Sequence, residues 1–199
     1  MSRIDHLDLK IVSELSKNGR VSISDLANET GVTRQTIANR MKRLHDEEII
    51  RVAGGLSLVK LGYEMATVGL EVRGEEVEGE LMKLMQCCPR VLTIFRAGGK
   101  EDLQVSMWGE SQKSIDSTIE SFKDFQGVTV ASTHYLGKPI HGSASFTMNP
   151  KDSTISPCGK DCSKCLSYSK SECPGCPDTS HYQNPEIKKP ARRMRDYWY

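Results

Sequence analysis

Apolar positions in the N-terminal quarter of the chain follow a helical period in three short segments. In the first segment, every fourth position from Leu7 to Leu15 is leucine or isoleucine, so these side chains line one helical face. Asp5 and Asp8 have the spacing of a capping box, in which each side chain accepts a hydrogen bond from the other's backbone N–H. We therefore expect the first helix to begin after Asp5 and to end at Asn18, before a glycine.

Two further helices are predicted, separated by a short turn. Ser22 and Asp25 form a second predicted capping box, and Gly31 stands where a left-handed residue commonly ends a helix. Two helices joined by a glycine-containing turn are typical of a helix-turn-helix. Thr33 is the expected cap of the last helix, whose apolar stripe consists of Ile37, Met41 and Leu44.

The polar face of this last helix has no acidic residue between positions 33 and 43. Arginine and lysine neutralise DNA phosphates, and Gln35 and Asn39 can pair with base edges in a major groove. We predict that this helix binds double-stranded DNA; the alternative is a plain three-helix bundle whose polar face is solvated. The predicted DNA-binding residues are Thr33, Arg34, Gln35, Thr36, Asn39, Arg40 and Arg43.

The same segment carries a pattern of residues that extends over all three predicted helices. The pattern consists of Asp5, Asp8, Ile11, Gly19-Arg20, Leu26-Ala27, Gly31-Val32, Arg40, Arg43-Leu44 and Ile49-Ile50. On these residues the chain resembles the N-terminal domain of the Lrp/AsnC (feast/famine) transcription regulators. The resemblance implies a winged-type helix-turn-helix whose recognition helix spans residues 33–43.

The middle of the chain alternates between strand-like and helix-like patterns. Strands are expected at residues 65–72, 91–97, 103–108 and 128–136, and helices at 75–86 and 111–125. This βαββαβ order is the ferredoxin-like order, in which helices cover one sheet face and a partner subunit can cover the other. The fold class is therefore α+β, and the resemblance implies a sensor domain that dimerises and binds amino acids between subunits.

A glycine turn joins two of these strands and carries a candidate effector site. The family hairpin often reads Gly-x-x-Asp followed by apolar residues, and Gly99 to Asp102 fit that pattern. Backbone amides at a glycine turn can hold a carboxylate, so Gly98, Gly99 and Asp102 are the predicted effector-binding residues. Leu103 replaces the aromatic residue usual in the family, which weakens the case for an amino acid, and an ordinary hairpin turn is the alternative.

Five of the seven cysteines are clustered near the C-terminus, after a polar segment with two prolines. Thiolates separated by two residues on a tight turn can bind one metal ion, and the pairs Cys162/Cys165 and Cys173/Cys176 have this spacing. Four thiolates suit zinc or an iron–sulfur cluster. We expect zinc as the cofactor, and an iron–sulfur cluster is the alternative. A disordered, reduced tail that binds no metal is the remaining possibility. The predicted metal ligands, of which four suffice, are Cys158, Cys162, Cys165, Cys173 and Cys176.

Other features near the cysteines have less specific interpretations. The spacing of Cys158, Cys162 and Cys165 also matches radical enzymes that use S-adenosylmethionine, but too few residues follow to build their barrel. His181 could compete for a metal position. Cys87 and Cys88 are expected to be small, buried or half-buried residues, with a redox pair between subunits as the weaker alternative.

Composition adds limits to this picture. The net charge is only +1, so basic residues matter through their placement, and no apolar run is long enough to span a membrane. No secretory signal or catalytic motif is recognisable, so a cytoplasmic protein that is not an enzyme is expected. The expected segments are a helix-turn-helix (1–52), a linker or connecting strand (53–64), the βαββαβ domain (65–142), a linker (143–157), the cysteine module (158–178) and a basic aromatic tail (179–199).

These features together predict a sequence-specific transcription regulator. It would act as a homodimer or a higher even-numbered oligomer on near-palindromic duplex DNA, with a small effector such as an amino acid. The cysteine tail would bind metal and report metal supply or redox state. The alternative from another class is a metal-handling or storage protein that uses its helical domain for protein contacts.

Overall fold

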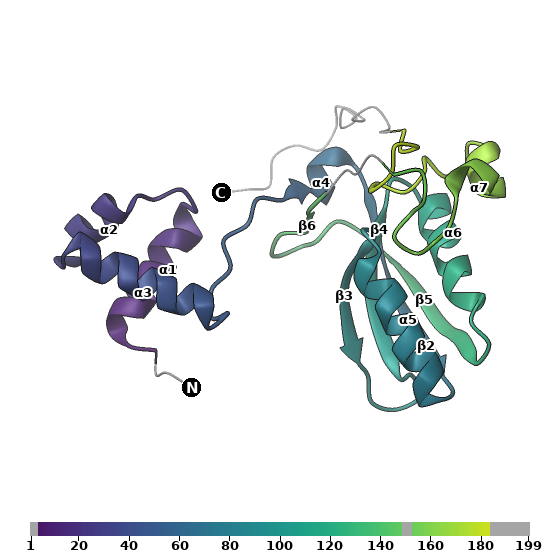
Figure 1. Ribbon diagram of the computed structural model, residues 1–199, viewed down its shortest axis with the longest axis horizontal. Coiled ribbons are helices and arrows are strands. Elements are labelled where there is room, and N and C mark those ends of the chain that lie inside the picture. Colours follow the sequence, from purple (N-terminus) through teal and green to yellow (C-terminus); the bar gives the residue numbers. More distant parts are fainter. Residues whose placement is uncertain (1–3, 149–152, 184–199) are drawn as a thin grey trace. The chain divides into compact units, whose positions relative to one another are not determined.

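The computed structural model describes residues 4–148 and 153–183 (Figure 1). The chain divides into two compact units, Met1–Gly54 and Gly55–Tyr199. Most of the basic aromatic tail, from residue 184 onward, lies outside the described residues. Among the described residues, no helix has the length and apolar character that a membrane span requires.

The N-terminal unit consists of three helices, α1 (His6–Lys17), α2 (Ile23–Thr30) and α3 (Arg34–Asp46). Their apolar stripes meet in a core whose fully buried members are Ile11, Leu26 and Ile37. Burial of such stripes provides most of the stability of short helices, which are marginal in isolation. The helical period of the sequence therefore located all three helices correctly.

The helix ends follow the predicted capping chemistry. Asp5 and Asp8 form the reciprocal capping box of α1, with hydrogen bonds of 3.0 and 3.1 Å. The Ser22 and Thr33 side chains each accept a backbone N–H at 3.1 Å at the starts of α2 and α3. Gly31 ends α2 with φ of 73°, the left-handed conformation that glycine adopts without steric cost.

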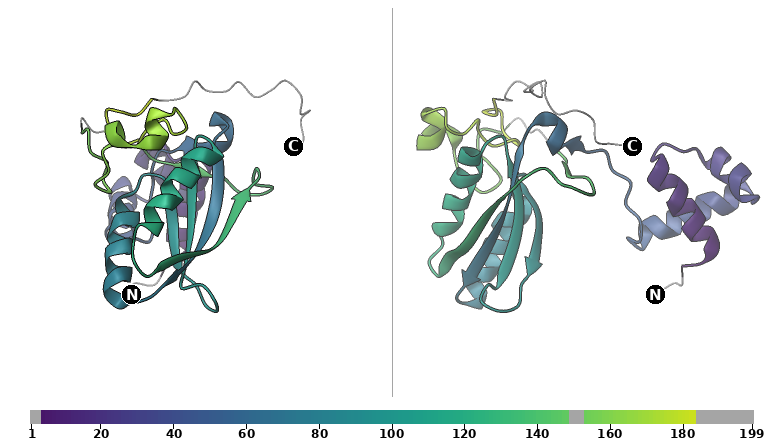
Figure 2. Two further views of the ribbon diagram at one scale, coloured as in Figure 1. Left: turned by 90° about the vertical axis from the view of Figure 1, so that its right-hand side faces the viewer. Right: turned by 180° about the vertical axis from the view of Figure 1, so that it is seen from behind.

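The second unit is built on an antiparallel four-stranded sheet in the order β3-β4-β2-β5. Its strands are β2 (Glu64–Val72), β3 (Val91–Arg96), β4 (Leu103–Gly109) and β5 (Val128–Leu136). Helices α5 (Glu75–Cys87) and α6 (Gln112–Lys123) lie on the same face of this sheet (Figure 2). The predicted ferredoxin-like βαββαβ order is confirmed.

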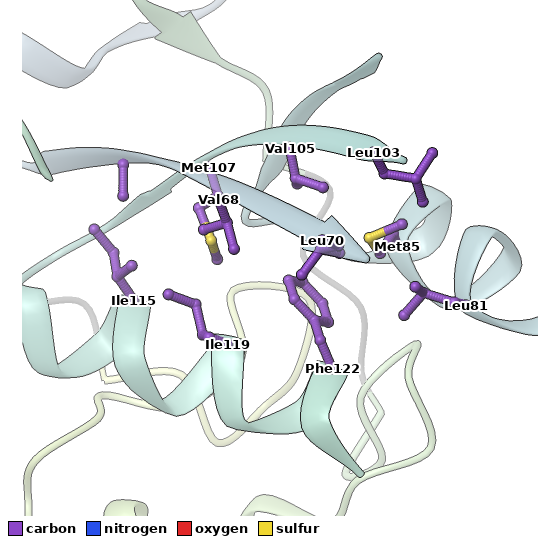
Figure 3. Packing of buried hydrophobic residues seen from close by; sticks show 11 residues of the cluster. Val68, Leu70, Leu81, Met85, Leu103, Val105, Met107, Ile115, Ile119 and Phe122 are labelled. Atoms are coloured by element: carbon purple, nitrogen blue, oxygen red, sulfur yellow. The ribbon is translucent and has the colours of Figure 1, made fainter. Parts of the chain in front are cut away.

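The main core lies between the two helices and the sheet (Figure 3). Alternate residues of the central strands β2 and β4 point into it, as the twofold period of a strand requires. Its buried members are Ala66, Val68, Leu70, Leu81, Met85, Leu103, Val105, Met107, Ile115, Ile119 and Phe122.

The opposite face of the sheet is more polar than the helix-covered face. Its cross-strand neighbours include Thr67 with Ser106 and Gly69 with Gln104. Phe95 on the edge strand β3 remains 59% exposed. A face of this kind stays partly solvated unless another surface covers it.

A small second core joins the segments on either side of the sheet domain. Strand β1 (Leu56–Ser57) pairs with β6 (Ser145–Phe146), and the short helix α4 (Leu58–Leu61) follows β1. Leu58 and Phe146 pack against Trp108, whose ring also stacks on Tyr63 at 5.4 Å. Residues 53–64 and 143–157 were predicted as linkers or a connecting strand, and these contacts make parts of both integral to the second unit.

The cysteine-rich segment packs against the sheet domain and contains two short turns of helix. These are η1 (Cys162–Lys164), a 3₁₀ turn, and α7 (Leu166–Ser169). The segment lies alongside α6 and forms an ion pair at each end of that helix. Glu172 pairs with Lys113 near its start, and Lys160 pairs with Asp124 just after its end. This packing against α6 was not predicted, because nothing in the cysteine spacing indicates which surface the segment contacts.

Candidate DNA-binding helix and thiol cavity

The solvent-exposed face of α3 carries most of the predicted DNA-binding residues. Thr33, Arg34, Gln35 and Asn39 are exposed, and Thr36 is half-buried. The Gln35 Nε2 donates to Asn39 Oδ1 at 2.9 Å, so the two amides form one polar patch. The first turn of α3 has no acidic residue, and the positive end of its helix dipole favours an anion such as phosphate.

Two of the predicted DNA-binding residues instead bind carboxylates of their own subunit. Arg40 Nη1 lies 2.5 Å from Asp5 Oδ2 and 3.2 Å from Asp8 Oδ1, and Arg43 Nη2 forms an ion pair with Asp8 Oδ2. The Asp8 side chain is fully buried. Both guanidiniums therefore join α3 to α1, and their charges are already neutralised within the unit.

The electrostatics of this network agree with a structural role. The pKa of Asp5 is lowered by the hydrogen bond from the Asp8 backbone N–H and then by the Arg40 guanidinium. Asp5 in turn raises the pKa of Arg40. The aspartate spacing predicted the capping box correctly, but no local pattern identifies a bond between residues more than thirty positions apart.

The candidate effector hairpin is held mainly by contacts of Asp102. Its Oδ2 accepts from the Val72 backbone N–H at 2.7 Å, and its own N–H donates to Leu70 O at 2.8 Å. Gly98 and Gly99 are exposed, and Gly99 has φ of 105°. Asp102 therefore fastens the turn to β2, and the exposed glycine amides are the groups that remain for a ligand.

Next to this hairpin, Glu101 extends across the open face of the sheet. Its carboxylate accepts from Ser132 Oγ at 2.5 Å and lies directly over Gly69, where an added Cβ would come within 2.1 Å of it. A side chain at position 69 would displace the Glu101 carboxylate from this place. Glu101 could not be recognised from the sequence, because a glutamate in a hairpin turn has no distinguishing pattern.

A cavity of ≈ 100 Å³ lies between the cysteine-rich segment, the α5–β3 corner and α6. Four of the five predicted metal ligands line it, together with Cys88 from the end of α5. Cys173 is absent from the lining and lies beside Arg90, whose Nη2 is 4.0 Å from its sulfur. The thiols of the lining are Cys88, Cys158, Cys162, Cys165 and Cys176.

A buried ion pair fastens the cysteine-rich segment to the sheet domain. Arg90 Nη1 and Glu110 Oε2 are 2.5 Å apart, and both side chains are only 4% exposed. Arg90 Nη2 also donates to Gly175 O at 2.6 Å, and Tyr182 OH donates to Glu110 Oε1 at 2.8 Å. Paired and fully hydrogen-bonded charges are the form in which burial is tolerated. Sequence reasoning did not identify this anchor.

The thiols of the cavity are reduced, and those of Cys88 and Cys176 are strongly desolvated. None of the seven cysteines, all of them in the described residues, forms a disulfide. Burial raises the pKa of Cys88 to about 11 and that of Cys176 to about 12. As the described side chains stand, no three histidine, cysteine, aspartate or glutamate side chains are arranged to hold a metal ion. The His181 ring packs edge-on against Tyr168.

Comparisons with known proteins show which proteins this chain resembles. Residues 4–51 match the family described as winged helix-turn-helix DNA-binding. An uncharacterized HTH-type transcriptional regulator of Pyrococcus furiosus is 30% identical over 133 residues, which are 66% of this chain and 89% of that protein. The HTH-type transcriptional regulator Ptr1 of Methanocaldococcus jannaschii is 32% identical over 101 residues, 50% of this chain and 68% of that protein.

Solved structures share the fold of both units. LrpC of B. subtilis aligns with a TM-score of 0.60 at 21% identity, over 70% of this chain and 99% of that one. A Neisseria meningitidis transcriptional regulator, in complex with L-Met, aligns with a TM-score of 0.63 at 23% identity, over 74% and 98%. The chain belongs to the Lrp/AsnC family of transcriptional regulators. Its relatives are regulators, not enzymes.

Part of this chain has the architecture that it shares with solved Lrp/AsnC proteins, and part of it has no counterpart in them. The solved Lrp/AsnC-like chains are aligned almost completely, yet more than a quarter of this chain has no counterpart in LrpC or the Neisseria regulator. The helix-turn-helix and the sensor domain account for a regulator that binds DNA. The thiol cavity needs a separate explanation in this Lrp/AsnC member.

Proposed function

We propose that this regulator reads specific duplex sequences with the exposed, N-terminal half of α3. The supporting observation is the acid-free patch of Arg34, Gln35 and Asn39 on a helix whose Arg40 and Arg43 are bound internally. Arg34 would contact phosphate or guanine, and the two amides would contact adenine edges. Arg40 and Arg43 would support this helix without touching DNA themselves.

The test compares Arg34→Ala and Asn39→Ala with Lys10→Ala, which removes an exposed cation of α1. The probe is a duplex selected by the wild-type protein from a random-sequence library, and affinity is measured by fluorescence anisotropy at fixed salt. Each α3 variant is expected to bind about ten- to a hundredfold more weakly. Lys10→Ala should stay within about twofold of wild type. Unchanged affinity in both α3 variants would refute this assignment.

Salt dependence separates the two kinds of contact. If Arg34 neutralises a phosphate, Arg34→Ala lowers the slope of log affinity against log salt by about one unit. Asn39→Ala leaves that slope unchanged but alters the preferred sequence. Equal salt slopes in the wild type, Arg34→Ala and Asn39→Ala would mean that Arg34 contacts a base and not a DNA phosphate.

We infer that two copies pair through the sensor domain, giving a homodimer or a higher even-numbered oligomer in the cytoplasm. The polar open face of the sheet and the exposed Phe95 on its edge strand support this pairing. A dimer would place two α3 helices on a near-palindromic site. Sedimentation velocity of the full chain tests it, and a monomer at micromolar concentration would contradict it.

An amino acid is the proposed effector, bound near the β3–β4 turn. The backbone amides of Gly98 and Gly99 would hold its carboxylate, and Glu101 lies close enough to this turn to attract its ammonium group. The Neisseria regulator carries L-Met in its solved complex. Calorimetric titration with the common amino acids tests the proposal, with Gly99→Val as the variant expected to abolish binding.

The cysteine-rich segment is proposed to bind a metal ion and to adjust DNA binding to metal supply or redox state. Zinc is the proposed cofactor, and an iron–sulfur cluster is the alternative. The support is chemical: the sequence clusters five thiols, and four of them line one cavity. Elemental analysis and the absorption spectrum of anaerobically purified protein distinguish zinc, which is colourless, from a brown iron–sulfur cluster.

A further inference from the structure

We propose that Cys88, a residue of the sensor domain, is a ligand of the metal site and takes the position that cysteine spacing alone assigns to Cys173. The inference rests on the proposed function of the tail as a metal-binding segment and specifies its ligands. The set consists of Cys88, Cys158, Cys176 and one thiolate from the turn that holds Cys162 and Cys165. The metal is zinc, bound through four thiolates.

The first argument is the position of Cys88 at the cavity. It follows the last turn of α5 and lines the cavity together with Cys158 and Cys176 of the tail. These three thiols come from three separate segments of the chain. They share one cavity, although in their present orientations no three side chains of the described residues are arranged to hold a metal ion.

The second argument is that hydrogen-bonded turns hold the tail thiols in place. Cys158 lies in a turn where Ser156 Oγ bonds its sulfur at 3.0 Å. The 3₁₀ turn from Cys162 to Cys165 is closed by a backbone bond of 3.1 Å, so its two thiols share one local frame. The Cys176 carbonyl accepts from both the backbone and the hydroxyl of Thr179.

The third argument is that Cys173 has another environment. It is missing from the cavity lining, and its sulfur accepts from Arg90 at 4.0 Å on the side of the buried ion pair. The sequence pairs Cys173 with Cys176 by spacing, but Cys176 lines the cavity and Cys173 does not.

The lining of the cavity also suits the charge of a zinc–thiolate centre. Each thiol that binds zinc releases its proton to solvent, so four thiolates and one Zn²⁺ leave a net charge of about −2. Arg90 and Lys160 line the same cavity and place positive charge beside it, and each of them is also paired with a carboxylate, that of Glu110 and that of Asp124 respectively. Three hydroxyl side chains of α6 also line the cavity, those of Ser117, Thr118 and Ser121. Thr118 and Ser121 donate to backbone carbonyls of their own helix.

Ligation by Cys88 has a consequence that a site made only of tail residues lacks. The metal would join the tail to the α5–β3 corner of the sensor domain, next to Arg90 and the Pro89 carbonyl that accepts from the Trp108 indole. Binding or loss of the ion would then change how firmly the tail is held on this domain. A self-contained tail site would leave that attachment unchanged.

The experiment measures zinc binding by the full-length protein and three single variants. Proteins are purified under reducing conditions, zinc per chain is measured by elemental analysis, and affinity is measured by competition with a chromophoric chelator. Cys88→Ser is expected to weaken zinc binding at least about a hundredfold, since even an outer-shell loss costs 10- to 100-fold. Cys87→Ser, at the neighbouring position, and Cys173→Ser should both stay within about threefold of wild type.

The outcomes distinguish ligation by Cys88 from metal binding by the tail, the proposed function on which it rests. Wild-type protein that binds no zinc would overturn both. Zinc binding that survives in Cys88→Ser but is lost in Cys173→Ser would overturn the inference alone and leave the site within the tail. An iron–sulfur spectrum that is unchanged in Cys88→Ser would have the same meaning.

A measurement on wild-type protein keeps the inference testable if Cys88→Ser does not fold. Cysteines are alkylated with and without added Zn²⁺, and each modified position is located by mass spectrometry. Zinc should slow the alkylation of Cys88 at least about tenfold, as expected for a ligand. Cys173 should react at an unchanged rate. Equal alkylation of Cys88 in both conditions would overturn the inference.

Discussion

The helical N-terminal unit and the cysteine-rich segment are both short, and both carry a recognisable pattern of chemical groups, but different contacts hold them. In the N-terminal unit, the capping residues, the core and the Arg–Asp network all belong to Met1–Gly54. The cysteine-rich segment is fastened by Arg90 and Glu110 of the sensor domain. A segment that buries its own apolar face can be interpreted locally, whereas one that lacks a core depends on its docking surface.

The same contrast applies to the functional groups. On α3, cations that share one helix divide into exposed Arg34 and internally paired Arg40 and Arg43. In the tail, cysteines that share one motif divide into cavity-lining thiols and Cys173. In both regions the residue type came from the sequence pattern, and the partner of each side chain came from tertiary packing.

The largest expected effect comes from breaking the anchor of the tail with Glu110→Ala. Removing one partner of a buried ion pair leaves an uncompensated charge and typically costs about 3–5 kcal/mol. Tyr182 loses its acceptor at the same time. The free energy of unfolding of the second unit should fall and backbone amides of residues 153–183 should exchange faster, as measured by hydrogen exchange with mass spectrometry. Unchanged exchange in this segment would mean that other contacts hold the tail.

The next largest effect concerns the corresponding network of the N-terminal unit. Arg43→Ala removes a charge-assisted hydrogen bond to the buried Asp8 carboxylate, so the unfolding free energy of this unit should fall by about 1.5–3 kcal/mol. Lys42→Ala, at the preceding exposed position, is the matched control and should change stability little. If Arg43→Ala weakens DNA binding while stability is unchanged, Arg43 contacts DNA directly.

A smaller effect is expected at the start of α3. Thr33→Ala removes the side-chain acceptor of the Thr36 backbone N–H and should cost about 1 kcal/mol. Thr33→Ser keeps the acceptor and should restore most of this stability. Thermal unfolding followed by circular dichroism measures both. Equal losses in the two variants would show that the threonine methyl group, and not the cap, provides the stability.

The smallest effect is a pH dependence of the unfolding free energy of the N-terminal unit at acid pH, which arises from Asp5. The pKa of Asp5 is lowered from 3.8 in the folded state. Its stabilising contribution is therefore complete above the unfolded pKa and is lost as pH falls below 3.8 through the folded value. The acid limb of stability, measured by urea unfolding between pH 5 and 2.5, should become shallower in Asp5→Asn.

Much of the architecture could be predicted from hydrophobic period and capping chemistry. Strand β5 lies at the predicted residues 128–136, and the three N-terminal helices begin at the predicted caps. Short-range signals were sufficient there, because each cap or apolar stripe involves residues within a few positions of one another. The segment 53–64 was harder, because α4 is a single turn that is stabilised by distant Trp108 and Phe146.

The candidate sites were predicted only in part. The exposed amides and Arg34 on α3 lie where the pattern indicated, whereas Arg40 and Arg43 have internal partners. Asp102 has the predicted position in the hairpin but binds the Val72 backbone. Cys88, Arg90 and Glu110 could not be recognised, because a lone buried ion pair or a cysteine before a proline has no periodic or spacing signal.

The sequence by itself determined the order of the elements, the family of the chain and the residue types available for DNA and metal chemistry. These depend on local periodicity, capping and spacing, which are properties of neighbouring residues. Only the tertiary structure decided which cations of α3 remain exposed, that the tail docks beside α6, and which thiols share a cavity. Such choices depend on contacts between residues far apart in sequence, where burial and charge pairing outweigh any local preference.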